Sequence, residues 1–381
     1  MRKFVLILLT VLMVSALYGQ TNKRTSAFNY HRYGKLDLAK EAIDDAAKHD
    51  RTINDARTWF YRGNIYYDIA MSSDEDFQNL DPDPLGVALE SYKRAGELDT
   101  KGEYTTNILQ YTLAIGEGYY NQGVIDYNNM DYIGAALSFK KSFNVSLEVG
   151  RVDTSALYNA AVAAVLGQEN EMAKDYYERV LELEYHRPDI YATLAELYKS
   201  EGDTTLALAT VVKGRELFPE DFNLLIAETN VYLTTGENEK AIENLEIARE
   251  IDKTNQSIFF AVGTIYDQMG DLDKALEAYD QAIELDPDYF EANYNLGALY
   301  VNMAADILDK ANNLPLDAVK EYEEQTTLAN DMLKKSLPYL EKSLELMPDD
   351  INTLISLKEI YTRLGMLEKL AEVDKLLKKE E

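Results

Sequence analysis

Cysteine is absent from this chain of 381 residues, and tryptophan occurs once. Without cysteine there is no thiol nucleophile, and the fold does not depend on disulfides. The three histidines, His31, His49 and His186, show no HxxH or HxxxH spacing that would present a metal-binding pair. The Gly-x-Ser-x-Gly, P-loop and Gly-x-Gly-x-x-Gly motifs are missing too. We therefore expect no enzyme activity, no catalytic residues, no cofactor and no metal ion.

Positive charge is also scarce. Lys and Arg total 38 against 67 Asp and Glu, which gives a formal net charge of −29. Nucleic-acid phosphates must be neutralised by Lys and Arg, so nucleic acid is excluded as a partner. Anionic membrane surfaces are disfavoured for the same reason. An acidic surface favours a basic or neutral partner, although the need for solubility also accounts for it.

The first residues have the pattern of an export signal. A basic start at Arg2 and Lys3 precedes residues 4–14, which are apolar with one exception, and small and polar residues then lead to Gln20. This pattern predicts a secretory signal peptide over 1–19, which is too short for a comfortable membrane span. An uncleaved membrane anchor is the alternative.

The predicted signal peptide also predicts where the protein is located. No cysteine follows the apolar run, which excludes a lipid-anchored lipoprotein. We expect an exported protein in the periplasm, with an extracellular or outer-envelope location as the alternative. After cleavage of the signal peptide, no integral membrane span is expected.

Landmark residues recur along the chain every 34 residues. A period of this length, carrying large, small and aromatic positions, indicates a helix–turn–helix repeat. The spacing is kept by three series: Tyr198, Tyr232, Tyr266 and Tyr300; Gly202, Gly236 and Gly270; and Ala207, Ala241 and Ala275.

The stretch 256–289 resembles a tetratricopeptide repeat (TPR). The family's positions 4, 7, 8, 11, 20, 24, 27 and 32 are matched by Phe259, Val262, Gly263, Tyr266, Ala275, Tyr279, Ala282 and Pro287. Small residues at positions 8 and 20 let two helices approach, and the aromatic residue at position 24 fills the space beside them. The resemblance implies an exported bacterial TPR protein with an all-α fold, a right-handed α-solenoid in which stacking buries the apolar faces.

The predicted domain organisation is a signal peptide at 1–19 and a TPR solenoid at 20–381. We expect about nine repeats, at about 20–53, 56–102, 116–149, 154–187, 188–221, 222–255, 256–289, 290–350 and 351–381. Two insertions, at about 72–84 and 304–331, interrupt this spacing.

The two insertions differ in character. Residues 72–84 are acidic and rich in turn formers, which predicts an exposed loop. An EF-hand calcium loop does not fit there, because the required Gly and Glu are missing. Residues 304–331 keep a helical period, so we expect both helices of the eighth repeat to be extended into a long hairpin. Pro338 is expected to kink or break the second of these helices.

The repeat geometry turns about six positions of each first helix toward the concave wall. Position 6 is asparagine in three repeats, at Asn121, Asn159 and Asn295. In TPR proteins that hold extended peptides, asparagine here grips the ligand backbone, since its amide both donates and accepts hydrogen bonds. An ordinary polar residue on a helix surface is the alternative.

Aromatic residues accompany these asparagines. Tyr158, Tyr294 and Phe260 stand at position 5, and Asn230 stands at position 9 of the sixth repeat. Tyrosine at position 5, where a carboxylate clamp would use lysine, argues against an acidic C-terminal tail as ligand. The candidate partner-binding residues are Asn121, Tyr158, Asn159, Asn230, Phe260, Tyr294 and Asn295.

The expected function is a non-catalytic scaffold or adaptor that binds a protein, as an extended peptide or helix, along the concave TPR surface. The hairpin at 304–331 would dock either a partner or a second copy of the chain. A carbohydrate- or small-molecule-binding component of an envelope uptake system is the alternative.

Overall fold

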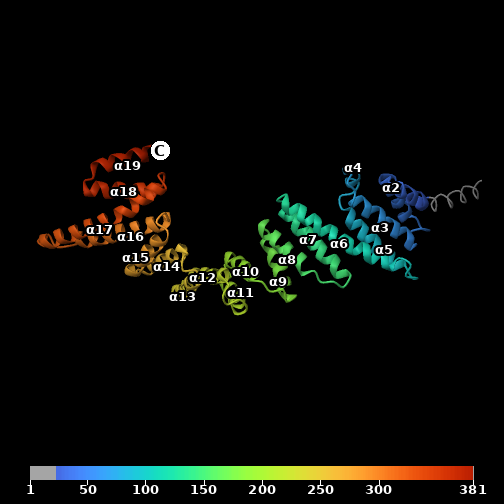
Figure 1. Ribbon diagram of the computed structural model, residues 1–381, viewed down its shortest axis with the longest axis horizontal. Coiled ribbons are helices and arrows are strands. Elements are labelled where there is room, and N and C mark those ends of the chain that lie inside the picture. Colours follow the sequence, from blue (N-terminus) through green and yellow to red (C-terminus); the bar gives the residue numbers. More distant parts are fainter. Residues whose placement is uncertain (1–22, 381) are drawn as a thin grey trace, which may run out of the picture. The chain divides into compact units, whose positions relative to one another are not determined.

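The computed structural model describes residues 23–380, and no strand occurs among them. The predicted all-α fold is therefore confirmed. The chain divides into two compact units, which meet in sequence between His186 and Arg187. Figure 1 shows each unit as a series of helix–turn–helix pairs. The predicted signal peptide at 1–19 lies outside the described residues.

Unit 1 contains a first helical segment at residues 23–32, followed by eight labelled helices. These are α2 (Leu36–Lys48), α3 (Ala56–Ala70), α4 (Glu75–Gln78), α5 (Pro84–Leu98), α6 (Thr105–Asn128), α7 (Tyr132–Glu148), α8 (Thr154–Leu166) and α9 (Asn170–Glu182).

Unit 2 continues the pattern of pairs. Its helices are α10 (Pro188–Ser200), α11 (Thr204–Leu217), α12 (Phe222–Thr235), α13 (Asn238–Ile251), α14 (Gln256–Met269), α15 (Leu272–Leu285), α16 (Phe290–Asn312), α17 (Val319–Leu346), α18 (Ile351–Leu364) and α19 (Leu367–Glu380). Within residues 23–380, no helix combines the length and the apolar character needed to cross a membrane.

Some of the many Asp residues cap the N-termini of helices. An Asp carboxylate just before a helix accepts a hydrogen bond from a backbone N–H of the first turn, which would otherwise lack a partner. This cap is made by Asp55, Asp83, Asp131, Asp153, Asp203, Asp221, Asp271 and Asp350.

In most of the described helix pairs, the turn takes the left-handed backbone conformation at one residue. Glycine adopts this conformation without a Cβ clash. Met130 and Gln168 occupy the same place in the α6–α7 and α8–α9 turns, with φ of 63° and 60°. The other described turns of this kind use Gly34, Gly202, Gly236, Gly270 and Gly365.

Close contact within a pair depends on a glycine that faces a ring. A Cβ added at Gly263 would lie 2.6 Å from the ring of Tyr279, and one at Gly123 would lie 2.8 Å from that of Phe139. Both rings are buried. The expected approach of two helices at a small residue, with an aromatic residue beside it, is confirmed in these pairs.

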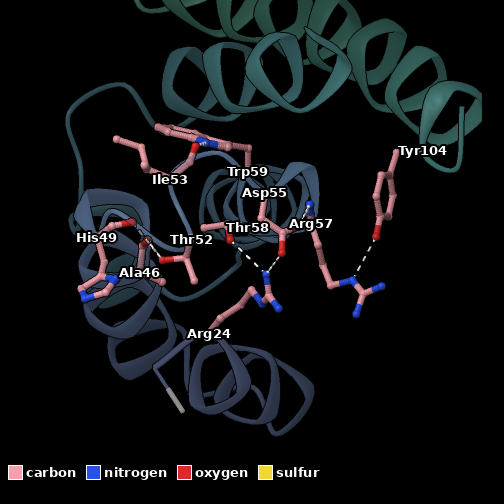
Figure 2. A network of polar contacts seen from close by, with 10 residues as sticks. All are labelled: Arg24, Ala46, His49, Thr52, Ile53, Asp55, Arg57, Thr58, Trp59 and Tyr104. Carbon is pink, nitrogen blue, oxygen red and sulfur yellow. Dashed lines mark hydrogen bonds and ion pairs between the residues drawn. The ribbon is translucent and has the colours of Figure 1, made fainter. Parts of the chain in front are cut away.

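A polar network joins the first two pairs of unit 1 (Figure 2). The Asp55 carboxylate caps α3 and also contacts the Arg24 guanidinium. Trp59 Nε1 donates to the backbone oxygen of Ile53 at 2.7 Å. These contacts fix the segment that leads from α2 into α3.

The insertion at 72–84 is not wholly the exposed loop that the sequence predicts. Asp74 caps the short helix α4, and Phe77 and Leu80 pack against the apolar cluster that contains Ile65 and Ile69. Apolar contact with the first pairs therefore orders this segment.

The segment assigned to the helical hairpin forms α16 and α17. Ala304, Ala311 and Ala329 are buried in this part of unit 2. Pro338 was expected to kink or break the second helix. The break does not occur, because α17 continues through this residue, and the kink stays a prediction. Pro338 is exposed, and the buried Leu333 and Leu340 on either side hold the helix in place.

Candidate functional site

One face of α6 and the adjoining face of α8 form a surface that we call the α6–α8 groove. Its α6 side carries residues at helical spacings of three and four, which place them on one face. The groove is defined by Tyr120, Asn121, Val124 and Tyr127 of α6 and by Tyr158, Asn159 and Val162 of α8.

An apolar pocket of about 270 Å³ lies within this groove. Val124 and Tyr127 wall it on one side, and Tyr158 and Val162 on the other. The buried ring of Phe139, from α7, also lines it. A pocket of this kind can receive an apolar side chain of a bound polypeptide.

A second pocket of about 340 Å³ in the same groove is polar. Asn121, Glu117 and Tyr120 line it from α6, and Arg151 and Asp153 line it from the segment before α8. It can bind polar atoms of a ligand, such as backbone N–H and C=O groups.

Asn159 connects the two pockets. Its Nδ2 donates to the hydroxyl of Tyr120 at 2.9 Å. The ring of Tyr120 in turn packs edge-on against Phe139, with ring centroids 5.2 Å apart. One amide N–H of Asn159 therefore serves the fold, and contact with a ligand would use the remaining groups of its side chain.

Unit 2 has a pocket at the equivalent place, between the first helices of two neighbouring pairs. Its volume is about 440 Å³, and Leu233 and Thr234 of α12 line it together with Phe260 and Thr264 of α14. Asn230 lies one turn before Thr234, whose hydroxyl donates to its backbone oxygen at 2.8 Å.

Phe260 and Asn295 both contact Tyr279, whereas Tyr294 contacts Phe290. The ring of Phe260 lies 5.8 Å from that of Tyr279. Burial raises the pKa of Tyr279, while its side-chain hydrogen bonds with Thr264 and Asn295 act in the opposite direction. Tyr294 stacks on the ring of Phe290 at 6.0 Å, and burial raises its pKa.

The seven predicted residues thus fall into two sets. Asn121, Tyr158 and Asn159 lie together in unit 1, whereas Asn230, Phe260, Tyr294 and Asn295 belong to unit 2. Their role in binding stays a prediction.

Sequence reasoning missed the apolar wall of the groove. Val124 and Val162 occupy position 9 of their repeats, a position expected to face the concave wall. Their position in the repeat is therefore the sequence feature that marks them as groove residues.

The groove contains little positive charge. Residues 102–139 include no Lys or Arg, and neither do residues 152–173. Arg151 stands just outside these ranges, at the polar pocket. Among residues 23–380, no group of three or more His, Asp or Glu is placed to hold a metal ion.

The pairs of antiparallel helices define the class, an α-helical repeat protein. The family model described as "TPR repeat" matches residues 263–303. The resemblance to the tetratricopeptide repeat inferred from the sequence is therefore confirmed over these residues.

Three solved structures are similar to the chain. A crystal structure of MamA has 18% identity and a TM-score of 0.40, covering 52% of this chain and 94% of its own. YrrB, described as a TPR protein with an unusual peptide-binding site, has 20% identity and a TM-score of 0.41, covering 54% and 98%. MamA from Desulfovibrio magneticus RS-1, from residue 41 onward, has 19% identity and a TM-score of 0.41, covering 52% and 97%. No curated protein matches the chain.

Proposed function

We propose that the protein is a non-catalytic scaffold that binds a partner polypeptide in the α6–α8 groove. The observation that carries the proposal is the apolar pocket of about 270 Å³ next to the amide side chain of Asn159. An apolar side chain of the partner would enter the pocket, and the polar pocket beyond Tyr120 would hold its backbone.

The pocket between α12 and α14 is a second candidate binding pocket for a side chain of the partner. Phe260 supplies the aromatic surface there, as Tyr158 does in unit 1. We further propose that this binding takes place after export, in the periplasm, since the start of the chain has the pattern of a signal peptide.

Replacing Val124 by Phe tests the groove. The larger side chain would fill the apolar pocket, so retention of partner proteins from an envelope extract on the immobilised protein should fall about tenfold or more, because excluding one buried apolar side chain removes about 1.5–3 kcal/mol.

Ile125→Phe is the matched control. Ile125 is the next residue of α6, it is also β-branched, it is 53% exposed, and it is not among the residues that line the pocket. Equal retention by the two variants would refute the groove as the binding site. Binding to a glycan array without any retained protein would instead favour the carbohydrate-binding alternative.

A further inference from the structure

Two buried hydroxyl groups belong to the lining of the polar pocket in the α6–α8 groove. Ser142 is 2% exposed and Ser146 is 8% exposed, and both residues line this pocket of about 340 Å³. Within residues 23–380, neither side-chain oxygen has a hydrogen-bond partner. A buried hydroxyl without a partner costs stability. A ligand in the pocket would supply the partners that these two groups lack.

Three charged side chains line the same pocket, and none of them forms an ion pair with another described residue. Arg151 and Asp153 belong to the segment before α8, and Glu117 belongs to α6. One oxygen of the Asp153 carboxylate accepts a hydrogen bond from the backbone N–H of Ala156 at 3.2 Å, which leaves the other oxygen available. The pocket therefore presents positive and negative groups that do not contact one another.

The charges decide which kind of ligand fits. The net charge of −29 repels anions, and Glu117 and Asp153 add to this repulsion inside the pocket. A simple cation would face the guanidinium of Arg151. A neutral sugar would leave all three charges without a counter-charge. An α-amino acid carries an ammonium and a carboxylate group and is neutral as a whole, so it can meet both signs without crossing a repulsive field.

We propose that the polar pocket binds a free α-amino acid. Its carboxylate would accept hydrogen bonds from Arg151 and from the hydroxyls of Ser142 and Ser146. Its ammonium group would donate to Glu117 and to the available oxygen of Asp153. The volume of about 340 Å³ is at the lower end of small-molecule pockets, as a ligand of this size requires. The inference goes beyond the proposed function, and the ligand would compete with the partner's backbone for this pocket.

The test measures binding of each of the common L-amino acids to the full chain by isothermal titration calorimetry. The one with the highest affinity is then compared with its N-acetyl derivative, which lacks the ammonium group, and with its amide, which lacks the carboxylate. Each derivative should bind more weakly by about tenfold or more, because each loses a charge-assisted contact. The inference is refuted if no amino acid binds, or if either derivative binds as tightly as its parent.

Replacing Arg151 by Gln tests the contact with the carboxylate. The affinity for the same amino acid should fall about tenfold or more. Arg32→Gln is the matched control, because Arg32 is also exposed, forms no ion pair with a described residue and is not among the residues that line the pocket. Its affinity should equal that of the wild type. Equal affinities of the two variants would show that Arg151 does not hold the ligand and would overturn the inference.

Ser142→Ala should change stability and affinity in opposite directions. Loss of an unpartnered hydroxyl and the better helix propensity of alanine should raise the urea midpoint of unit 1, followed by the fluorescence of Trp59. Loss of a hydrogen bond to the carboxylate should weaken binding about tenfold. Unchanged affinity would show that the ligand does not occupy this pocket. The comparison of Val124→Phe with Ile125→Phe decides the proposed function separately, because it concerns the apolar pocket.

Discussion

Replacing Gly123 by alanine tests the close approach of α6 and α7 beneath the apolar pocket. The new Cβ would lie 2.8 Å from two ring carbons of Phe139, whereas carbon atoms in contact are about 3.5–4.0 Å apart. Phe139 is only 4% exposed, so its ring has little room to move. Overpacking of this kind costs about 1–3 kcal/mol. The better helix propensity of alanine offsets about 1 kcal/mol, and we expect a net loss of about 1 kcal/mol.

Gly116→Ala, in the same helix, is the control with the opposite expected sign. Its Cβ would lie 3.5 Å from Cγ1 of Val145, which is an ordinary contact. Only the better helix propensity of alanine then changes the stability, so the free energy of unfolding of this variant should rise by about 1 kcal/mol. The free energies of unfolding of the two alanine variants should therefore differ by about 2 kcal/mol.

Trp59 supplies the assay. It is the one tryptophan of the chain and lies in α3, so its fluorescence during urea unfolding reports on unit 1. The difference in free energy of unfolding follows from the midpoints and slopes of the transitions. If Gly123→Ala proves as stable as Gly116→Ala, the contact between glycine and ring does not limit the packing of this pair.

Two other predictions concern unit 2. Pro338→Ala should raise the free energy of unfolding by about 1–3 kcal/mol in a urea titration followed by circular dichroism, because proline in an exposed helix interior lacks the N–H donor; an unchanged midpoint would contradict this. Burial, aided by the Glu228 carboxylate, raises the pKa of Tyr232 to about 12. The stability from this shift is present below pH 10 and is lost as the pH rises from 10 to 12, because the unfolded state loses its proton first. In the Tyr232→Phe variant, the urea midpoint should therefore fall less steeply between pH 10 and pH 12 than in the wild type. Equal slopes for the two proteins would refute the link between this pH dependence and Tyr232.

Much of the fold follows from short-range features of the sequence. Gly202, Gly236 and Gly270 mark the turns, and Gly263 with Tyr279 marks a close approach, because each feature repeats at a fixed spacing. The break expected at Pro338 does not occur, because its effect depends on tertiary packing. The helix continues where buried side chains on both sides hold it, and local propensity alone does not contain that information.

The site was less predictable than the fold. Asparagine at position 6 pointed to the groove, but the hydrogen bond between Asn159 and Tyr120 joins residues that are 39 apart in sequence. Such pairing depends on how neighbouring repeats stack. The left-handed conformation of Met130 likewise becomes visible only with the backbone geometry, since most turns of this kind carry glycine.

The tip between α16 and α17 offers a practical point of access. Leu316 there is fully exposed, and the turn lies beyond the ends of both helices. Exposed loop tips tolerate added sequence better than helical segments. A fluorescent reporter or affinity tag inserted at this tip would therefore leave both termini and the α6–α8 groove unaltered, and the protein could be followed in living cells without a change to the first residues of its sequence.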